Sequence, residues 1–336
     1  MLAHPTISIG FLSLGFSFQF LGTFFNLPLA SYLAAMSVLV SLYLFKKITP
    51  LLFIFVLSVS FLFFLLSPSP YVLASLVPLI GILFSGANKH SVHDRLISRY
   101  FFVVTFYCFY LIYYLAGFTY LEGSASHNQL SVLLVYALIA ELLYFGTLSR
   151  LYIPLIVISF LLFGNRSAVF LLAVFIRSKT ILLIFLGIGA IFVLFTYEIL
   201  SPPGELKRLF EIGGILYRSS VDARGDYLDE FVHSFNLLDL RYDKWKFFDT
   251  PKTVDGAYDL HNSILTIVVR DSYLGLFKVF LWLFQIWFLP LGVFSGITLR
   301  AFYDTFLLGG INDILVFALV GRSIKTVLRN RRGSDG

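Results

Sequence analysis

The sequence predicts an all-α protein, a polytopic helical membrane bundle of roughly 12 (10–12) transmembrane helices with one large periplasmic loop. Of the 336 residues, 58% are hydrophobic and only 13% are charged, against about 45–50% and about 25% in soluble domains. The mean hydropathy is +0.87. The apolar runs are continuous, unlike the short alternating segments of a transmembrane barrel. This composition excludes a soluble enzyme, a secreted disulfide scaffold and a disordered chain.

The apolar runs give the expected helices in order, because a transmembrane helix needs roughly 20 apolar residues. A polar stretch at 201–260 separates the long apolar part of the chain from a final apolar region at 272–320. The expected spans before the polar stretch are residues 7–25, 27–45, 50–66, 70–85, 100–117, 129–146, 151–177 and 180–200.

Basic residues orient these helices. Lys46 and Lys47 lie between the second and third spans, a basic loop with Arg99 at its end lies between the fourth and fifth, and Arg150 follows the sixth. The intervening loops contain no Lys or Arg. The positive-inside rule therefore places the N-terminus, the basic loops and the basic C-terminal tail in the cytoplasm. The net charge of +6 accordingly reports membrane orientation, and we expect no nucleic-acid partner.

The span at 151–177 is interrupted at residues 164–167, Gly-Asn-Arg-Ser. We favour two short helices with Arg166 at the outer surface, because a charge at the bilayer centre costs about 2.5–3.5 kcal/mol and Gly-Asn favours a break. The polar stretch is then on the outer side of the membrane, and three short passes follow, with turns near Leu289 and Gly309. The alternative is one long helix, which would place the polar stretch in the cytoplasm.

The expected organisation is a transmembrane bundle at 1–200, a periplasmic loop with short helices at 201–260, C-terminal helices at 261–322 and a basic tail at 323–336. The loop is compositionally distinct, with 11 of the 19 acidic and 8 of the 25 basic residues. The single cysteine, Cys108, lies in an apolar run and is expected to be buried.

Three groups of polar residues indicate chemistry beside the membrane. Arg166, between two apolar runs, is placed to clamp a phosphate, although a snorkelling side chain or a helix cap would explain it as well. His261, where the loop returns to the membrane, suits proton transfer, although many histidines are structural. Arg218 and Arg224 in the loop either hold a diphosphate or belong to a solvated helix start.

Two further charge pairs have structural alternatives. Arg270 and Asp271 either line the site or mark the interface, and Arg300 and Asp304, four residues apart, suit an ion pair inside the bundle. The first outer loop, near Asn26, contains no acidic residue. This argues against the metal-dependent lipid-linked glycosyltransferases, which need carboxylates to hold the cation. We therefore expect no metal and no cofactor.

The order of these motifs resembles the bacterial O-antigen polymerase and O-antigen ligase superfamily. The resemblance covers mainly residues 151–275: an Asn-Arg-Ser break at Arg166, an outer-loop arginine best matched by Arg224, and a His-Asn pair at His261 and Asn262. In that family the His-Asn pair is followed by glycines eleven and fourteen positions after the histidine. Here these positions are Ser272 and Gly275, so one glycine is replaced.

The resemblance implies a metal-independent, inverting glycosyltransferase of the bacterial inner membrane with a periplasmic site. Its donor would be an oligosaccharide on undecaprenyl pyrophosphate, and a chain-length regulator protein is a possible partner besides the bilayer. His261, Arg166 and Arg224 would be catalytic. Groups that bind substrate would be Asn262, Arg218, Tyr227, Tyr258 and Arg270.

We favour the polymerase, which extends a lipid-linked repeat unit in lipopolysaccharide or other surface polysaccharide biosynthesis. The ligase, which transfers the chain to lipid A-core, is the alternative within this class. A transporter of lipid-linked glycans is the alternative outside it, because buried charges also line transport paths. No internal repeat of the kind found in many transporters is evident in the sequence.

Overall fold

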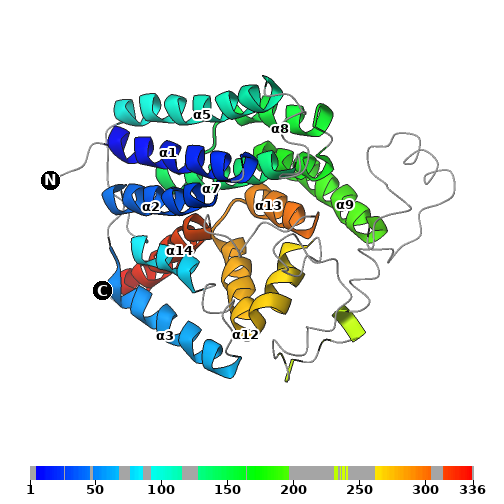
Figure 1. Cartoon of the computed structure of the whole chain (residues 1–336). Coiled ribbons are helices and arrows are strands. Elements are labelled where there is room, and N and C mark those ends of the chain that lie inside the picture. The colour runs from blue at the N-terminus through cyan, green and yellow to red at the C-terminus, as the bar shows by residue number, and fades with distance from the viewer. Residues whose placement is uncertain are drawn as a thin grey trace. The chain divides into compact units, whose positions relative to one another are not determined.

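The computed structural model describes residues 5–25, 27–45, 48–67, 76–85, 92–115, 128–163, 165–196, 262–303 and 313–334, with 231–233 and positions 235, 237, 238 and 240. Every element within these ranges is a helix, which confirms the all-α class for the described part of the chain (Figure 1). The elements are α1 Pro5–Phe24, α2 Pro28–Phe45, α3 Pro50–Leu66, η1 Val77–Phe84, α5 Val92–Leu115, α7 Asn128–Phe145, α8 Tyr152–Leu161, η2 Arg166–Phe175, α9 Lys179–Thr196, α12 Ser263–Leu283, η4 Phe284–Trp287, α13 Leu291–Tyr303 and α14 Asp313–Ser334.

The helix boundaries confirm two of the expected breaks. Helix α8 ends at Leu161 and the 3-10 helix η2 begins at Arg166, so the segment at 151–177 consists of two short helices. A second break separates η4 from α13 around Pro290. The expected turn near Gly309 lies outside the described residues.

The chain packs as two compact units that are each discontinuous in sequence. The first contains residues 1–59, 76–159 and 310–336, and the second contains 60–75 and 160–309. The linear division expected from the sequence stays a prediction. Of the expected site residues, the three that the structure describes, Arg166, Asn262 and Arg270, fall within the second unit.

Helix α1 organises the first unit by packing against both α2 and α5 (Figure 1). Phe16 of α1 lies edge-on to Phe102 and Phe106 of α5, with ring centroids 5.6 and 5.1 Å apart. On its other side, Ser8 donates to the Ser41 carbonyl of α2 at 2.8 Å. The hydroxyl groups of Ser41 and Tyr144 lie 2.7 Å apart, which extends the same polar contact to α7.

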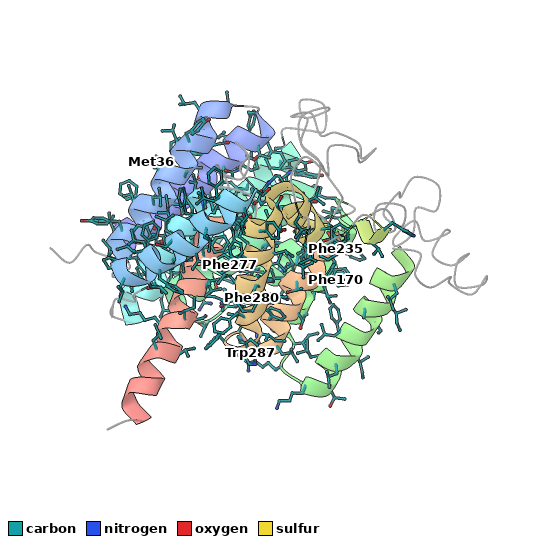
Figure 2. All side chains as sticks on the ribbon, turned by 90° about the horizontal axis from the view of Figure 1, so that it is seen from below. Met36, Phe170, Phe235, Phe277, Phe280 and Trp287 are labelled. Carbon is teal, nitrogen blue, oxygen red and sulfur yellow. The ribbon has the colours of Figure 1, made fainter. Side chains whose placement is uncertain are left out.

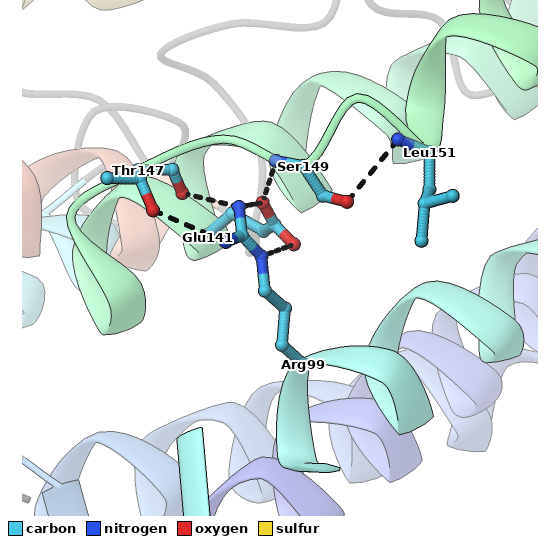
Figure 3. Close-up of polar contacts among 5 residues, drawn as sticks. All are labelled: Arg99, Glu141, Thr147, Ser149 and Leu151. Carbon is cyan, nitrogen blue, oxygen red and sulfur yellow. Dashed lines mark hydrogen bonds and ion pairs between the residues drawn. The ribbon is translucent and has the colours of Figure 1, made fainter. Parts of the chain in front are cut away.

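An ion pair joins α5 to α7, and the hydrogen bonds around it extend to the turn between α7 and α8 (Figure 3). Arg99 donates from Nε and Nη2 to the two carboxylate oxygens of Glu141, at 3.1 and 2.8 Å. The same carboxylate accepts from the Ser149 backbone N–H at 2.7 Å, and Nη2 of Arg99 also reaches the Thr147 carbonyl at 3.0 Å. Glu141 is fully buried. This forked geometry therefore fixes the turn against α5.

Truncating one partner is expected to destabilise the first unit strongly. Glu141→Ala leaves Arg99 without its carboxylate, and breaking a buried pair in this way costs about 3–5 kcal/mol. The double variant Arg99→Met/Glu141→Leu leaves no charge behind and should recover most of that loss. Thermal unfolding of the purified protein in detergent measures both effects, and a double variant as unstable as the single one would refute this explanation.

Large apolar side chains of the first unit are exposed along α2 and α5. Met36 of α2, labelled in Figure 2, is 59% exposed, and Leu115 of α5 is 69% exposed. Soluble monomers rarely expose contiguous apolar patches of more than a few hundred Å². The other large apolar residues exposed on α5 are Leu96, Ile97, Tyr100, Phe101, Val104, Leu111, Ile112 and Tyr114.

Two described helices, Thr6–Phe24 and Leu96–Leu115, are long and apolar enough to cross a membrane by length and composition. The shorter apolar helices of the described part span 10–17 residues. Helices buried in soluble proteins pass the same test, so the topology of roughly 12 spans stays a prediction.

Cys108 lies on the exposed face of α5, so the expectation that it is buried is wrong. Hydropathy assigned it to an apolar run but does not distinguish a protein core from an outward-facing helix surface. The position is useful because it is the only cysteine in the chain.

A nitroxide attached to Cys108 in liposomes is expected to be relaxed by oxygen much more than by a water-soluble nickel complex, because its face of α5 would contact lipid. The matched control is Arg150→Cys in a Cys108→Ser background, since Arg150 is exposed in a polar turn. That position should show the opposite preference. Equal accessibility of Cys108 to both reagents would contradict a lipid-facing α5.

Candidate functional site

Helix α13 organises the second unit through a close contact with η2. A Cβ atom on Gly292 would lie 2.3 Å from the Ala173 carbonyl oxygen, and one on Gly296 would lie 2.8 Å from the Phe170 carbonyl oxygen. Glycines four residues apart let two helices approach to backbone contact, a spacing common in membrane helix pairs. The order of these contacts makes η2 antiparallel to α13 and places the backbone of Arg166 near the level of Arg300.

At the Asn-Arg-Ser break, Asn165 caps the N-terminus of η2. Oδ1 of Asn165 accepts hydrogen bonds from the Ser167 hydroxyl at 2.8 Å and from the Ala168 backbone N–H at 3.3 Å. Asn165 is 1% exposed. The cap therefore fixes the start of η2, and Arg166 is its first residue. The side chain of Arg166 is outside the described residues.

A second asparagine caps α12 at the end of the polar stretch. Oδ1 of Asn262 accepts from the backbone N–H groups of Ile264 and Leu265 at 2.9 and 3.1 Å. The side chain is 2% exposed. This capping gives Asn262 a structural role in addition to the substrate-binding role that the sequence predicts for it. His261 immediately precedes the cap and lies outside the described residues.

Helix α12 reverses direction at Ser272, where the backbone has φ 54° and ψ −128°. It therefore consists of two helical halves that meet at a sharp angle (Figure 1). A Cβ on Gly275 would lie 2.1 Å from the Ile267 carbonyl oxygen and 3.0 Å from Cα of Val268. Only glycine allows the second half to come so close to the first. This hairpin was not predicted from the sequence.

The left-handed backbone of Ser272 and the contact at Gly275 occupy the two positions at which the resembled family has glycine. Positive φ favours glycine because it has no Cβ, and the close approach at Gly275 excludes any side chain. Both requirements follow from a single feature, the tight reversal of α12.

Three charged groups meet at this reversal. Asp271 accepts from Arg270 Nε at 2.8 Å and from Lys278 Nζ at 3.1 Å. Asp271 and Lys278 are both fully buried, whereas the Arg270 side chain is 22% exposed. Arg270, Asp271 and Lys278 are called the α12 charge cluster below. Its two cations and one carboxylate carry a net charge of +1.

The α12 hairpin and η2 both pack against α13. The indole N–H of Trp282 donates to Oγ1 of Thr298 at 3.1 Å, and its ring stacks on Phe294 at 5.8 Å. Arg300, two residues beyond Thr298, is fully buried. The expected ion pair with Asp304 is not described, because Asp304 lies outside the described residues.

Three of the eight predicted site residues lie in the described part of the chain. Arg166, Asn262 and Arg270 belong to helices of one unit, and Arg270 is the predicted residue whose side-chain geometry is most fully defined. The remaining predicted residues lie outside the described part of the chain: His261, Arg224, Arg218, Tyr227 and Tyr258.

Lys278 is the residue that sequence reasoning missed. A single lysine in an otherwise apolar run, Leu-Gly-Leu-Phe-Lys-Val-Phe-Leu, was a usable signal, since ionisable residues inside a membrane segment are costly and often functional. Among the described residues, no three His, Cys, Asp or Glu side chains gather as a metal site would require.

No protein-family model matches the chain, and no curated protein or solved structure is significantly similar to it. The described part of the chain therefore defines only a general class: an all-helical protein with exposed apolar helix faces and a charge cluster in α12.

Exchanging Ser272 for glycine is expected to stabilise the protein by about 1 kcal/mol. Backbone strain of this kind costs about 1–3 kcal/mol, which exceeds the entropic cost of glycine, about 0.5–1 kcal/mol. Ser295→Gly, in the regular helix α13, should instead destabilise by about 1 kcal/mol. Both variants can be compared with wild type by thermal unfolding, and a lower melting temperature for Ser272→Gly would count against the left-handed turn.

Proposed function

We propose that the chain is a surface-polysaccharide polymerase of the bacterial inner membrane. It would transfer a glycan from undecaprenyl pyrophosphate onto the next lipid-linked repeat unit at the periplasmic face, without a metal ion and with inversion. The exposed apolar faces of α2 and α5 support a membrane location. The proposed topology has roughly 12 helices, with both termini in the cytoplasm.

One observation carries the proposal beyond a general membrane protein. The reversal of α12 places a positive φ at Ser272 and a close backbone contact at Gly275, eleven and fourteen residues after His261. The resembled family has glycine at both positions, and this chain keeps the second of them. A chance match of short motifs would not be expected to coincide with a left-handed turn and a backbone contact. We therefore interpret the His-Asn motif as the sequence that precedes the α12 hairpin in this class of protein.

The proposed chemistry needs a base and an anion-binding group. A hydroxyl of the acceptor sugar attacks the anomeric carbon of the donor, and the bond from that carbon to the diphosphate oxygen breaks. His261 takes the hydroxyl proton. Arg166, Arg224 and Arg270 stabilise the charge that develops on the diphosphate.

The remaining predicted residues would bind and orient the sugars. Tyr227 and Tyr258 offer ring faces and hydroxyl groups, and Arg218 offers a second cation in the same loop. Asn262 fixes the start of α12. The apolar segments that flank these residues in the sequence would hold the polyprenyl tail.

A glycan ladder from cells lacking this protein tests the proposal. We expect the deletion to leave single repeat units on the surface lipid, and wild-type protein to restore the ladder. Arg166→Ala should fail to restore it at normal membrane levels. Loss of even the single-unit glycan would instead favour the ligase or the transporter, and a ladder that is unaffected by the deletion would refute a role in glycan assembly.

A further inference from the structure

We propose that Asp271 and Lys278 are positioning residues of the donor site: Lys278 anchors the Asp271 carboxylate, and Asp271 orients the Arg270 guanidinium toward the diphosphate leaving group. This inference rests on the proposed function and adds two residues that no motif assigns to it.

The contact between Lys278 and Asp271 depends on the reversal of α12. Residues seven apart on a straight helix are separated by about 10 Å along its axis. Here Nζ of Lys278 lies 3.1 Å from Oδ2 of Asp271, because the helix folds back at Ser272. The two halves of the hairpin are thus joined by two contacts. One is the ion pair between Asp271 and Lys278, and the other is the close backbone approach at Gly275.

The geometry divides the cluster into an anchored part and an accessible part. Arg270 donates from Nε to Oδ1 of Asp271 at 2.8 Å and from Nη2 to Oδ2 at 3.3 Å, which is a forked pair. Such pairing fixes the plane of the guanidinium. Of the three side chains only that of Arg270 is partly accessible, so it is the member that can reach a ligand.

The burial of the pair argues that stability alone does not explain it. Removing two charges from water costs several kcal/mol per ion, and well-packed apolar residues often replace a buried pair without loss. An apolar contact would close the hairpin equally well. It could not hold a guanidinium in a fixed plane, which is what Asp271 does.

Three variants separate positioning from simple closure of the hairpin. Asp271→Asn weakens the hold on Arg270, and Lys278→Met removes the anchor. The exchange variant Asp271→Lys/Lys278→Asp restores an ion pair between the two halves but places a lysine beside Arg270. If the pair only closes the hairpin, the exchange variant should behave like wild type. If Asp271 orients Arg270, the exchange variant should stay folded but lose the function of Arg270.

The experiment measures two properties of each full-length variant in detergent: the melting temperature, and the affinity for farnesyl diphosphate, with farnesol as the control ligand. We expect about tenfold weaker diphosphate binding for Asp271→Asn and for the exchange variant. The exchange variant should nevertheless melt close to wild type, and farnesol binding should not change.

The inference is overturned if the exchange variant recovers wild-type affinity, or if Lys278→Met binds farnesyl diphosphate as wild type does. It is also overturned if wild type itself shows no preference for the diphosphate over farnesol. These outcomes are distinct from failure of the proposed function, which the glycan ladder of the deletion strain decides without any of these variants.

Discussion

Gly275→Ala is expected to prevent α12 from closing and to lower the yield of folded protein sharply. The added methyl group would lie 2.1 Å from the Ile267 carbonyl oxygen, a backbone atom that cannot rotate away. Inserting one methyl group into a tight core already costs about 1–3 kcal/mol. Because the backbone itself must move here, we expect a loss at or above the upper end of that range.

Gly187→Ala is the matched control, because Gly187 lies in α9 of the same unit and a Cβ there meets nothing within 4 Å. It should leave stability unchanged or raise it by up to about 1 kcal/mol, since alanine favours helix. Both variants are compared by the amount of monodisperse protein and by melting temperature. A Gly275→Ala protein that behaves like Gly187→Ala would mean that the hairpin does not exist as described.

His261→Ala is expected to reduce glycan transfer by about 10²- to 10⁴-fold, the usual contribution of a general base. Folding should be preserved, because the α12 cap is formed by Asn262. Affinity for the diphosphate-linked donor should also be preserved, because the arginines rather than the histidine would bind it. The rate of transfer and the donor affinity are therefore measured separately.

His233→Ala provides the control, because His233 lies in the same polar stretch and is exposed. It should transfer glycan at the wild-type rate. A His261→Ala protein that retains full activity would remove this residue from the catalytic step, whatever the family. A variant that loses donor binding as well as activity would assign His261 to binding instead.

The elements that could be predicted from the sequence are those with a local signal. The break before Arg166 coincides with Gly-Asn, and the break before α13 coincides with Pro290, both of which disfavour a continuing helix. Continuous apolar runs also placed most of the helices of the first unit. At 70–85, however, the described part of the expected span forms only the short helix η1, Val77–Phe84.

The remaining features depend on contacts between distant residues. Ser272 has no local preference for a left-handed backbone, and only the approach of Gly275 to Ile267 shows why the chain turns there. The role of Lys278 can be recognised only from the structure, because the reversal of α12 brings it into contact with Asp271. The exposure of Cys108 depends on which face of α5 lies outward, which hydropathy does not reveal.

The most direct test of the proposed polymerase uses purified protein in liposomes containing a polyprenyl-diphosphate-linked repeat unit, in the presence of EDTA. We predict that wild type forms a two-unit product and releases one polyprenyl diphosphate for each new linkage. The His261→Ala protein should form neither. Movement of the intact donor across the bilayer without diphosphate release, or a product that forms only after a divalent cation is added, would contradict the proposed function.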